Sequence, residues 1–284
     1  MPKDTIEDGH TIITVDNLFE NVKENLVLSS FVTKLDNDCS KAYFTSLKKG
    51  LDIKINNIEV NSHELEVLTA ELIKPVVIKI SSGEVNIKIT VGIGKRSLKE
   101  GGWYIICNGR LVMAAEQTEI TGWRQGPIPQ YHPDYAYFRG VVEFNSENSS
   151  FLPWTTTKTG VDRNNQAYRK ALFEMKQHML IVINFLKEKV KEEKQIKLYE
   201  IEDTVIADAI QSSVYTAFNE LEMNDKFEAP TRVHYQPINK LTKVQYTVET
   251  SKLDSVKKSL QVDTATAAGT KTFEYYMKYE VQVE

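Results

Sequence analysis

The chain has 284 residues, of which 41% are hydrophobic and 26% charged, a composition typical of a soluble globular protein. Lysine and arginine number 35 against 39 acidic residues, so the net charge of -4 gives no overall basic field favouring nucleic acid, although a local basic patch stays open. The sequence contains no apolar run long enough to span a membrane and no signal peptide, so we expect a cytoplasmic protein without a membrane partner.

Cysteines and histidines indicate neither a metal site nor a disulfide. Cys39 falls in a predicted helix and Cys107 in a predicted strand, so free, buried thiols are favoured over a disulfide. The five histidines are dispersed without metal-ligand spacing, which excludes an obvious zinc site. His132, in a proline-rich loop with Tyr131 and Asp134, is the most site-like of them, but a structural role is favoured because the sequence offers no partner for proton transfer.

The N-terminal part begins with a β-branched run, 9–15, which predicts a strand. Apolar residues then recur at spacings of three and four from Phe19 to Lys49, which predicts a helical region with a potential break around 36–38. Gly50 is expected to cap the C-terminal end of that region.

From residue 51 onward the period of the apolar residues changes to two, which predicts strands with one buried face. The 51–55 run is the first of them. A turn at Ser81-Ser82-Gly83 and a tight turn at Asn108-Gly109 each predict a pair of antiparallel strands. The predicted strands around and after these turns are 76–80, 85–91, 103–107, 110–113 and 137–144.

Beyond Asp162 the pattern becomes helical. One apolar seam runs from Tyr168 to Leu186, and we favour packing within the chain over pairing with a partner helix because the seam spans fewer than three heptads. A second helix over 201–223 would complete a helical hairpin. The last part is predicted to contain a hairpin (231–235 and 243–248), a helix (253–260) and a final strand (273–283), for which a helix is the main alternative.

These patterns predict an α+β protein in three units: an α/β domain (1–160), a helical hairpin (161–226) and a small C-terminal α/β subdomain (227–284). At the end of the first unit lies the stretch Leu152-Pro153-Trp154-Thr155-Thr156-Thr157-Lys158-Thr159-Gly160, whose threonines and helix breakers predict a loop. A lysine presented among hydroxyl groups is a point charge suited to a phosphate oxygen. The alternative interpretation is an ordinary solvated turn.

Several motifs of this sequence, taken as a set, resemble one protein superfamily. They are Gly102-Trp103-Tyr104, Asn108-Gly109-Arg110, Pro153-Trp154 and Thr157-Lys158-Thr159-Gly160-Val161-Asp162. Over roughly residues 9 to 190 the chain resembles the transducer domain of the GHKL ATPases, the superfamily of gyrase B, MutL, the heat-shock chaperones and histidine kinases. The resemblance implies a ribosomal-S5-like transducer fold in a bacterial ATP-binding protein that couples ATP binding and hydrolysis to conformational change.

By this resemblance, Lys158 would be the catalytic residue that contacts the γ-phosphate of ATP, with Thr156, Thr157 and Thr159 beside it. ATP and Mg²⁺ would be held by an N-terminal ATPase domain, the implied partner, because no Asp-x-Gly-x-Gly motif is present here. Gly92-Ile93-Gly94-Lys95-Arg96 does not fit a P-loop either. We therefore expect this chain to be the C-terminal part of a larger ATPase, either as a shortened form of that protein or as a natural remnant of it. No activity is expected from this chain alone.

Two other interpretations remain open. The chain could be a non-catalytic interaction or dimerisation protein that retains the transducer fold, with a homodimer among its expected forms. It could also carry a DNA-binding module in its last sixty residues, where basic and aromatic side chains cluster. These are Arg232, His234, Tyr235, Lys240, Lys243 and Tyr246. The partner or substrate is not indicated by any motif.

Overall fold

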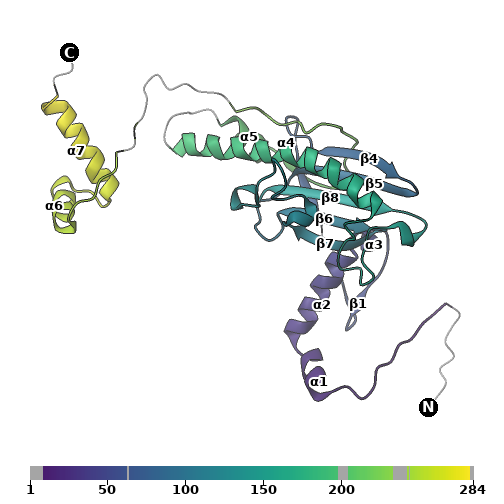
Figure 1. Ribbon diagram of the computed structural model, residues 1–284. Helices are drawn as coiled ribbons and strands as arrows, with labels where there is room; N and C mark the ends of the chain where they lie inside the picture. Colours follow the sequence, from purple (N-terminus) through teal and green to yellow (C-terminus); the bar gives the residue numbers. More distant parts are fainter. Residues whose placement is uncertain (1–8, 63, 198–203, 233–241, 243, 282–284) are drawn as a thin grey trace. The chain divides into compact units, whose positions relative to one another are not determined.

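The computed structural model describes residues 9–62, 64–197, 204–232, 242 and 244–281. The chain groups by its internal contacts into two compact units, Met1–Tyr235 and Gln236–Glu284, whereas the boundaries expected from the sequence are at 160 and 226. The larger unit combines a five-stranded mixed sheet with a long helix, so the predicted α+β class is confirmed (Figure 1). Among the described residues, no helix has the length and hydropathy needed to cross a bilayer.

The central sheet has the strand order β4-β5-β8-β6-β7. Its strands are β4 (Val76–Ser82), β5 (Val85–Ile93), β6 (Gly102–Cys107), β7 (Arg110–Glu116) and β8 (Phe138–Asn145). The predicted hairpins β4–β5 and β6–β7 are confirmed. The sheet is nevertheless not a sequential meander, because β8 inserts between β5 and β6 and runs parallel to β6.

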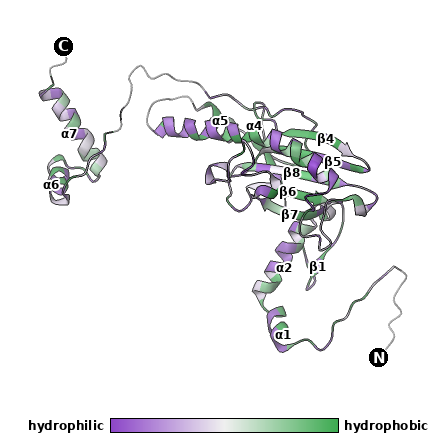
Figure 2. Cartoon of the chain, viewed as in Figure 1, coloured by the Kyte–Doolittle hydropathy of each residue, from purple (hydrophilic) through white to green (hydrophobic). Residues whose placement is uncertain are grey.

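Helix α4 (Gln166–Lys197) lies on one face of this sheet and supplies much of the core (Figure 1). Tyr168, Met175, Met179, Val182 and Leu186 from the predicted seam are completely buried, which confirms packing within the chain. Against them lies the apolar face of β5, whose strand alternates hydrophobic and hydrophilic residues (Figure 2). The apolar residues of α4 recur with the 3.6-residue period of a helix, and those of β5 with the two-residue period of a strand. Each pattern places its apolar side chains on one face, and the two faces pack together.

On the opposite face, a smaller cluster forms around Phe44, Tyr104 and Phe218. It is covered by helix α3 (Phe44–Lys48) and by a two-stranded sheet in which β3 (Glu66–Thr69) pairs with β9 (Val214–Ala217). The same face of the sheet also carries charge, since Lys79, Lys88 and Glu143 occupy one cross-strand row.

The N-terminal region differs from the sequence-based expectation. Residues 9–15 form no strand and are exposed, because β-branched residues favour an extended chain but a strand also needs a hydrogen-bonded neighbour. The helical region contains α1 (Glu20–Leu26), α2 (Ser29–Ala42) and α3, separated near Val27 and at Tyr43 and not around 36–38. Gly50 follows α3 with φ 99, as expected for a C-terminal glycine. The predicted 51–55 strand is reduced to β1 (Lys54–Ile55), which pairs with β2 (Ile58–Glu59).

The predicted second helix, 201–223, is wrong in its extent, although a short helix does follow α4 and contact it. Helix α5 covers Val205–Gln211 and the chain then becomes β9. Two serines, Ser212 and Ser213, and the β-branched residues Val214 and Thr216 favour this change. The hydroxyl groups of Thr216 and Thr69 lie 2.6 Å apart across the strand pair, so tertiary pairing with β3 determines the outcome.

The smaller unit contains helix α6 (Thr250–Leu260), which confirms the predicted 253–260 helix, and helix α7 (Ala265–Tyr279). The final strand predicted over 273–283 is wrong and its helical alternative is right. Thr264 caps the N-terminal end of α7 by accepting a hydrogen bond from the Ala267 N–H. The alternation of apolar and polar residues after Phe273, which predicted the strand, therefore lies within a helix that begins upstream. The described part of this unit contains no strand, in contrast to the predicted α/β subdomain. Most of the predicted 231–235 strand, with His234, Tyr235, Lys240 and Lys243, lies outside the described residues.

Candidate functional site

The predicted lysine loop joins β8, through the short 3-10 helix η3 (Ser149–Phe151), to α4. An isolated antiparallel bridge between Trp154 and Val161 closes its base. Two backbone hydrogen bonds reinforce that bridge: the Thr155 N–H donates to the Gly160 carbonyl at 2.9 Å, and the Asp162 N–H to the Pro153 carbonyl at 2.8 Å. Leu152 and Pro153 are buried below it. The loop is therefore a small, closed hairpin anchored in the core.

Asn165 connects the two ends of this loop. Its side-chain oxygen accepts hydrogen bonds from the backbone N–H groups of Ala167 (2.9 Å) and Tyr168 (3.2 Å), which makes it the N-terminal cap of α4. Its side-chain nitrogen donates to the Phe151 carbonyl at 3.1 Å. The position of the loop is thus coupled directly to the first turn of α4.

The tip of the loop carries the predicted site residues Thr156, Thr157, Lys158 and Thr159, all of them exposed. Lys158 is in the left-handed region with φ 56, and its N–H donates to the Thr155 carbonyl at 2.8 Å, which closes a tight turn. The hydroxyl groups of Thr157 and Thr159 are 2.9 Å apart. The structure therefore places the four predicted residues together at one exposed loop tip, where the hydroxyl groups of Thr157 and Thr159 contact each other.

The ammonium group of Lys158 lies over the ring of Trp154, 4.6 Å from its centroid. An exposed cation–π contact of this kind contributes about 0.5–1 kcal/mol, enough to bias the side chain without fixing it. Within the described residues, no carboxylate is within ion-pairing distance of Lys158. Its charge is consequently positioned by an aromatic ring and available to an anion.

The Asn108-Gly109-Arg110 motif has a structural role in this fold. Asn108 (φ 45) and Gly109 (φ 78) form the left-handed turn between β6 and β7. The Asn108 side chain accepts from the Ser146 N–H at 2.9 Å and donates to the Ser146 carbonyl at 2.8 Å, which ties the turn to the end of β8. Arg110 donates to the Tyr43 hydroxyl at 2.7 Å. The motif therefore joins the sheet to its neighbours and does not meet Lys158.

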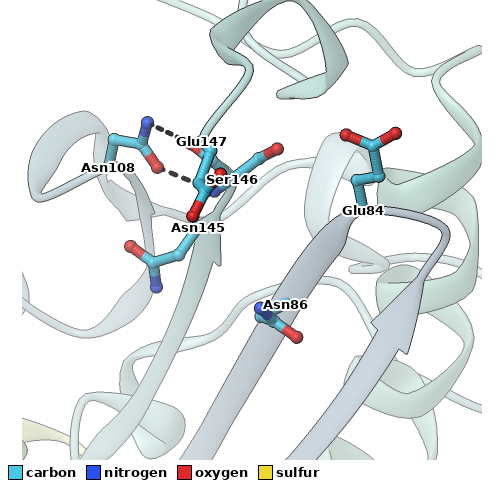
Figure 3. Close-up of a pocket in the computed structure, with 6 residues that line it drawn as sticks. All are labelled: Glu84, Asn86, Asn108, Asn145, Ser146 and Glu147. Carbon is cyan, nitrogen blue, oxygen red and sulfur yellow. Dashed lines mark hydrogen bonds between the residues drawn. The ribbon is translucent and has the colours of Figure 1, made fainter.

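A shallow depression of about 480 Å³ lies beside this turn. Its lining, shown in Figure 3, consists of Glu84, Asn86, Asn108, Asn145, Ser146 and Glu147. Two carboxylates and no cation line it, so its electrostatic potential opposes phosphate binding. The described residues also contain no group of three or more side chains suited to a metal ion. The depression is therefore a poor phosphate or metal site, and the lysine loop is the better candidate.

Two further side chains have structural roles, one expected and one not. The Nδ1 of His132 accepts a hydrogen bond from the Asp134 N–H at 3.2 Å, which fits the favoured role of a loop histidine. The buried guanidinium of Arg139 donates to the carbonyls of Lys95 (2.7 Å) and Phe138 (3.0 Å), and burial lowers its pKa. Sequence analysis did not single out Arg139, because one arginine in an apolar strand carries no recognisable signal.

Comparison with known proteins does not assign the chain to a family. No family model matches the chain, and no curated protein is found to be similar. Among solved structures, the chain is similar to the B subunit of the DNA gyrase from Myxococcus xanthus, with a TM-score of 0.28 and 11% identity. The match covers 44% of this chain and 39% of the gyrase chain, well under two thirds of that subunit. A match of this extent does not place the chain in a family.

Proposed function

We propose that the chain is the transducer and C-terminal portion of a GHKL-type ATPase, and that Lys158 contacts the γ-phosphate of ATP bound in a separate nucleotide-binding domain. The observation that carries this proposal is the presentation of Lys158: exposed, free of carboxylates among the described residues, and held over Trp154 at the tip of an anchored hairpin. The resemblance of the sequence motifs to those of transducer domains supplies the class of ligand that we propose.

The chemistry of the loop suits a terminal phosphate. The lysine ammonium is a compact charge with three donors, and the threonine hydroxyls around it can donate to further phosphate oxygens. A cation placed where negative charge develops stabilises a phosphoryl-transfer transition state. Release from the Trp154 ring costs little, because the contact is solvent-exposed. Lys158 can therefore move from the ring to a phosphate oxygen when nucleotide is present.

The same loop offers a route for coupling. Asn165 ties the loop to the first turn of α4, and α4 packs along the sheet through its buried seam. A displacement of the tip by a bound phosphate would act on the start of this helix. The proposed coupling requires such an element, with two positions that nucleotide binding biases.

The proposal assigns Mg²⁺ and most of the nucleotide contacts to the other domain. The described residues contain no candidate metal-ligand cluster. They would contribute one cation and several hydroxyl groups toward the γ-phosphate. The exposed apolar side chains Ile12, Ile13, Phe19 and Val27 near the N-terminal end are consistent with a surface that a neighbouring domain covers.

The decisive experiment measures ATP turnover in a protein that joins this chain to its nucleotide-binding domain. Lys158→Ala is expected to reduce turnover at least about tenfold, as the loss of a phosphate-stabilising charge does. Lys158→Arg keeps the charge and should retain more of the activity. The matched control is Lys226→Ala, since Lys226 is also an exposed loop cation but lies beside the edge of β4. Wild-type turnover in Lys158→Ala would overturn the proposal.

A further inference from the structure

The turn between β6 and β7 contains the one Asn-Gly dipeptide of the chain, Asn108-Gly109. In such a dipeptide the backbone nitrogen of the glycine can attack the asparagine carboxamide, because glycine has no side chain to obstruct the approach. Asn108 is exposed to solvent, and among the described contacts the Gly109 N–H has no backbone acceptor. The two reacting groups of a deamidation are therefore adjacent in sequence and accessible to water.

In the folded chain, two hydrogen bonds hold the Asn108 side chain against Ser146, which directly follows β8 (Figure 3). The side-chain oxygen accepts from the Ser146 N–H at 2.9 Å, and the side-chain nitrogen, Nδ2, donates to the Ser146 carbonyl at 2.8 Å. Both bonds require a side chain with one donor and one acceptor group, which a carboxamide supplies and a carboxylate does not. We call this pair of hydrogen bonds the Asn108 clamp.

We propose that Asn108 is a site of spontaneous deamidation, that the Asn108 clamp controls its rate, and that the product releases the β6–β7 turn from the end of β8. The Gly109 nitrogen gives its proton to water and forms a bond to Cγ of Asn108. The Cγ–Nδ2 bond breaks, and the nitrogen takes up a proton and leaves as ammonia. Water then opens the cyclic succinimide at either carbonyl, which gives aspartate or isoaspartate, and nothing is oxidised or reduced.

The clamp controls the rate because the reaction cannot proceed while it is closed. Cγ has to turn toward the Gly109 nitrogen, and Nδ2, the leaving group, has to be released from the Ser146 carbonyl. The reactive form is therefore a locally opened turn, and its population depends on the free energy of opening. An exposed turn opens without global unfolding, so the folded chain reacts, but more slowly than the unfolded chain.

The product does not restore the clamp. In aspartate, an oxygen would face the Ser146 carbonyl where Nδ2 now donates at 2.8 Å, and two acceptors at this distance repel each other. Aspartate also adds a third carboxylate to the depression lined by Glu84 and Glu147. Isoaspartate lengthens the main chain by a methylene group within a tight turn whose φ angles are 45 and 78. Either product should therefore loosen the contact between the turn and β8.

The first test follows deamidation of the full chain at mildly alkaline pH, folded and in urea, by peptide mapping with mass spectrometry. The peptide with Asn108 should convert in the folded chain, and at least about tenfold faster in urea, because unfolding removes the clamp. Asn148 is the control within the same sample, since it is exposed and is followed by Ser149 instead of glycine. It should stay unmodified over the same interval.

A second test imitates the product with Asn108→Asp. Amide exchange at 108–110 should accelerate at least about tenfold in this variant, because the donor to the Ser146 carbonyl is lost. Asn145→Asp is the matched control: Asn145 lines the same depression, but its side chain makes no hydrogen bond among the described contacts. It adds the same charge without opening the clamp, so exchange at 108–110 should not change. Circular dichroism verifies that both variants fold.

Three results would overturn the proposal. If the chain converts at Asn108 in urea but never in its folded form, the fold blocks the reaction. Equal rates in the two conditions would show that the clamp does not control the reaction. Equal exchange in Asn108→Asp and Asn145→Asp would assign the effect to charge and not to the lost hydrogen bond. None of these assays uses ATP, so their outcomes are independent of the proposed role of Lys158.

Discussion

The carboxylate of Glu192 in α4 accepts hydrogen bonds from the backbone N–H groups of Ile206 (3.1 Å) and Ala207 (3.0 Å) at the start of α5. Glu192 is 1% exposed, so a residue from a charge-rich stretch of sequence lies in the interior. The N–H groups in the first turn of a helix have no partner within the helix, and the Glu192 carboxylate accepts hydrogen bonds from two of them in α5. Its negative charge also interacts favourably with the positive end of the helix dipole. Through this contact α4 determines where α5 begins.

Replacement of Glu192 by alanine should therefore release α5. Two N–H groups, one buried and one partly buried, would lose their acceptor, and we expect a loss of about 2 kcal/mol in the free energy of unfolding. Amide exchange should accelerate first in Val205–Gln211. Glu220→Ala is the control, because Glu220 is exposed, and it should change stability by less than about 0.5 kcal/mol. Unchanged exchange in α5 would show that the cap is dispensable.

Gly140 in β8 should not tolerate even one added methyl group. A Cβ at this position would lie 2.4 Å from the Trp103 ring, which is itself buried and donates from its indole nitrogen to the Met179 sulfur. We expect Gly140→Ala to destabilise the larger unit by about 1–3 kcal/mol in chemical denaturation. At Gly160 the nearest atom to an added Cβ is 3.6 Å away, so Gly160→Ala should be tolerated; equal effects would contradict this packing.

Asn165 should matter more than its neighbour Asn164. Its side chain caps α4 and donates to the Phe151 carbonyl, whereas Asn164 is exposed and uses only its backbone N–H in the described contacts. Asn165→Ala should cost about 1 kcal/mol and increase amide exchange in the first turn of α4 and the lysine loop. Asn164→Ala should do neither. If the two variants behave alike, the loop is not coupled to α4 through Asn165.

The Glu143 carboxyl should make stability depend on pH. Burial raises its pKa above the ordinary value of 4.5, and this effect outweighs the opposing charges of Lys88, Lys49 and Lys79. A folded-state pKa above the unfolded value means that the folded state binds the proton more tightly. The contribution of Glu143 to stability is therefore fully present below pH 4.5 and is lost as pH rises through the raised pKa.

Glu143→Gln tests this sign directly. The glutamine cannot ionise, so the stability of the variant relative to the wild type should increase as pH rises from about 4 to 7 in urea denaturation. Glu222 is exposed, and Glu222→Gln should show no such trend. A difference that is constant with pH would mean that the lysines cancel the effect of burial on the Glu143 pKa, and the opposite trend would mean that they outweigh it.

Local sequence determined the elements in which short-range pattern and turn chemistry agree. The β4–β5 and β6–β7 hairpins were predictable because alternating apolar residues meet turn residues such as Asn108-Gly109. The same holds for α4 and α6, and for the exposed loop around Lys158, where four threonines and the breakers Pro153 and Gly160 exclude a helix. In these stretches, residues close together in the sequence determine most of the backbone conformation.

Tertiary structure decided the elements in which two local solutions compete or a distant partner is required. Val214 and Thr216 became a strand because β3 supplied a ladder, whereas 9–15 found none among the described residues and stayed extended without pairing. The insertion of β8 beside β6, the cap from Glu192 and the contact of Lys158 with the Trp154 ring depend on contacts that local pattern does not encode. The sequence alone predicted that Lys158 lies in a loop. The closed hairpin that holds its charge over Trp154 depends on the tertiary structure.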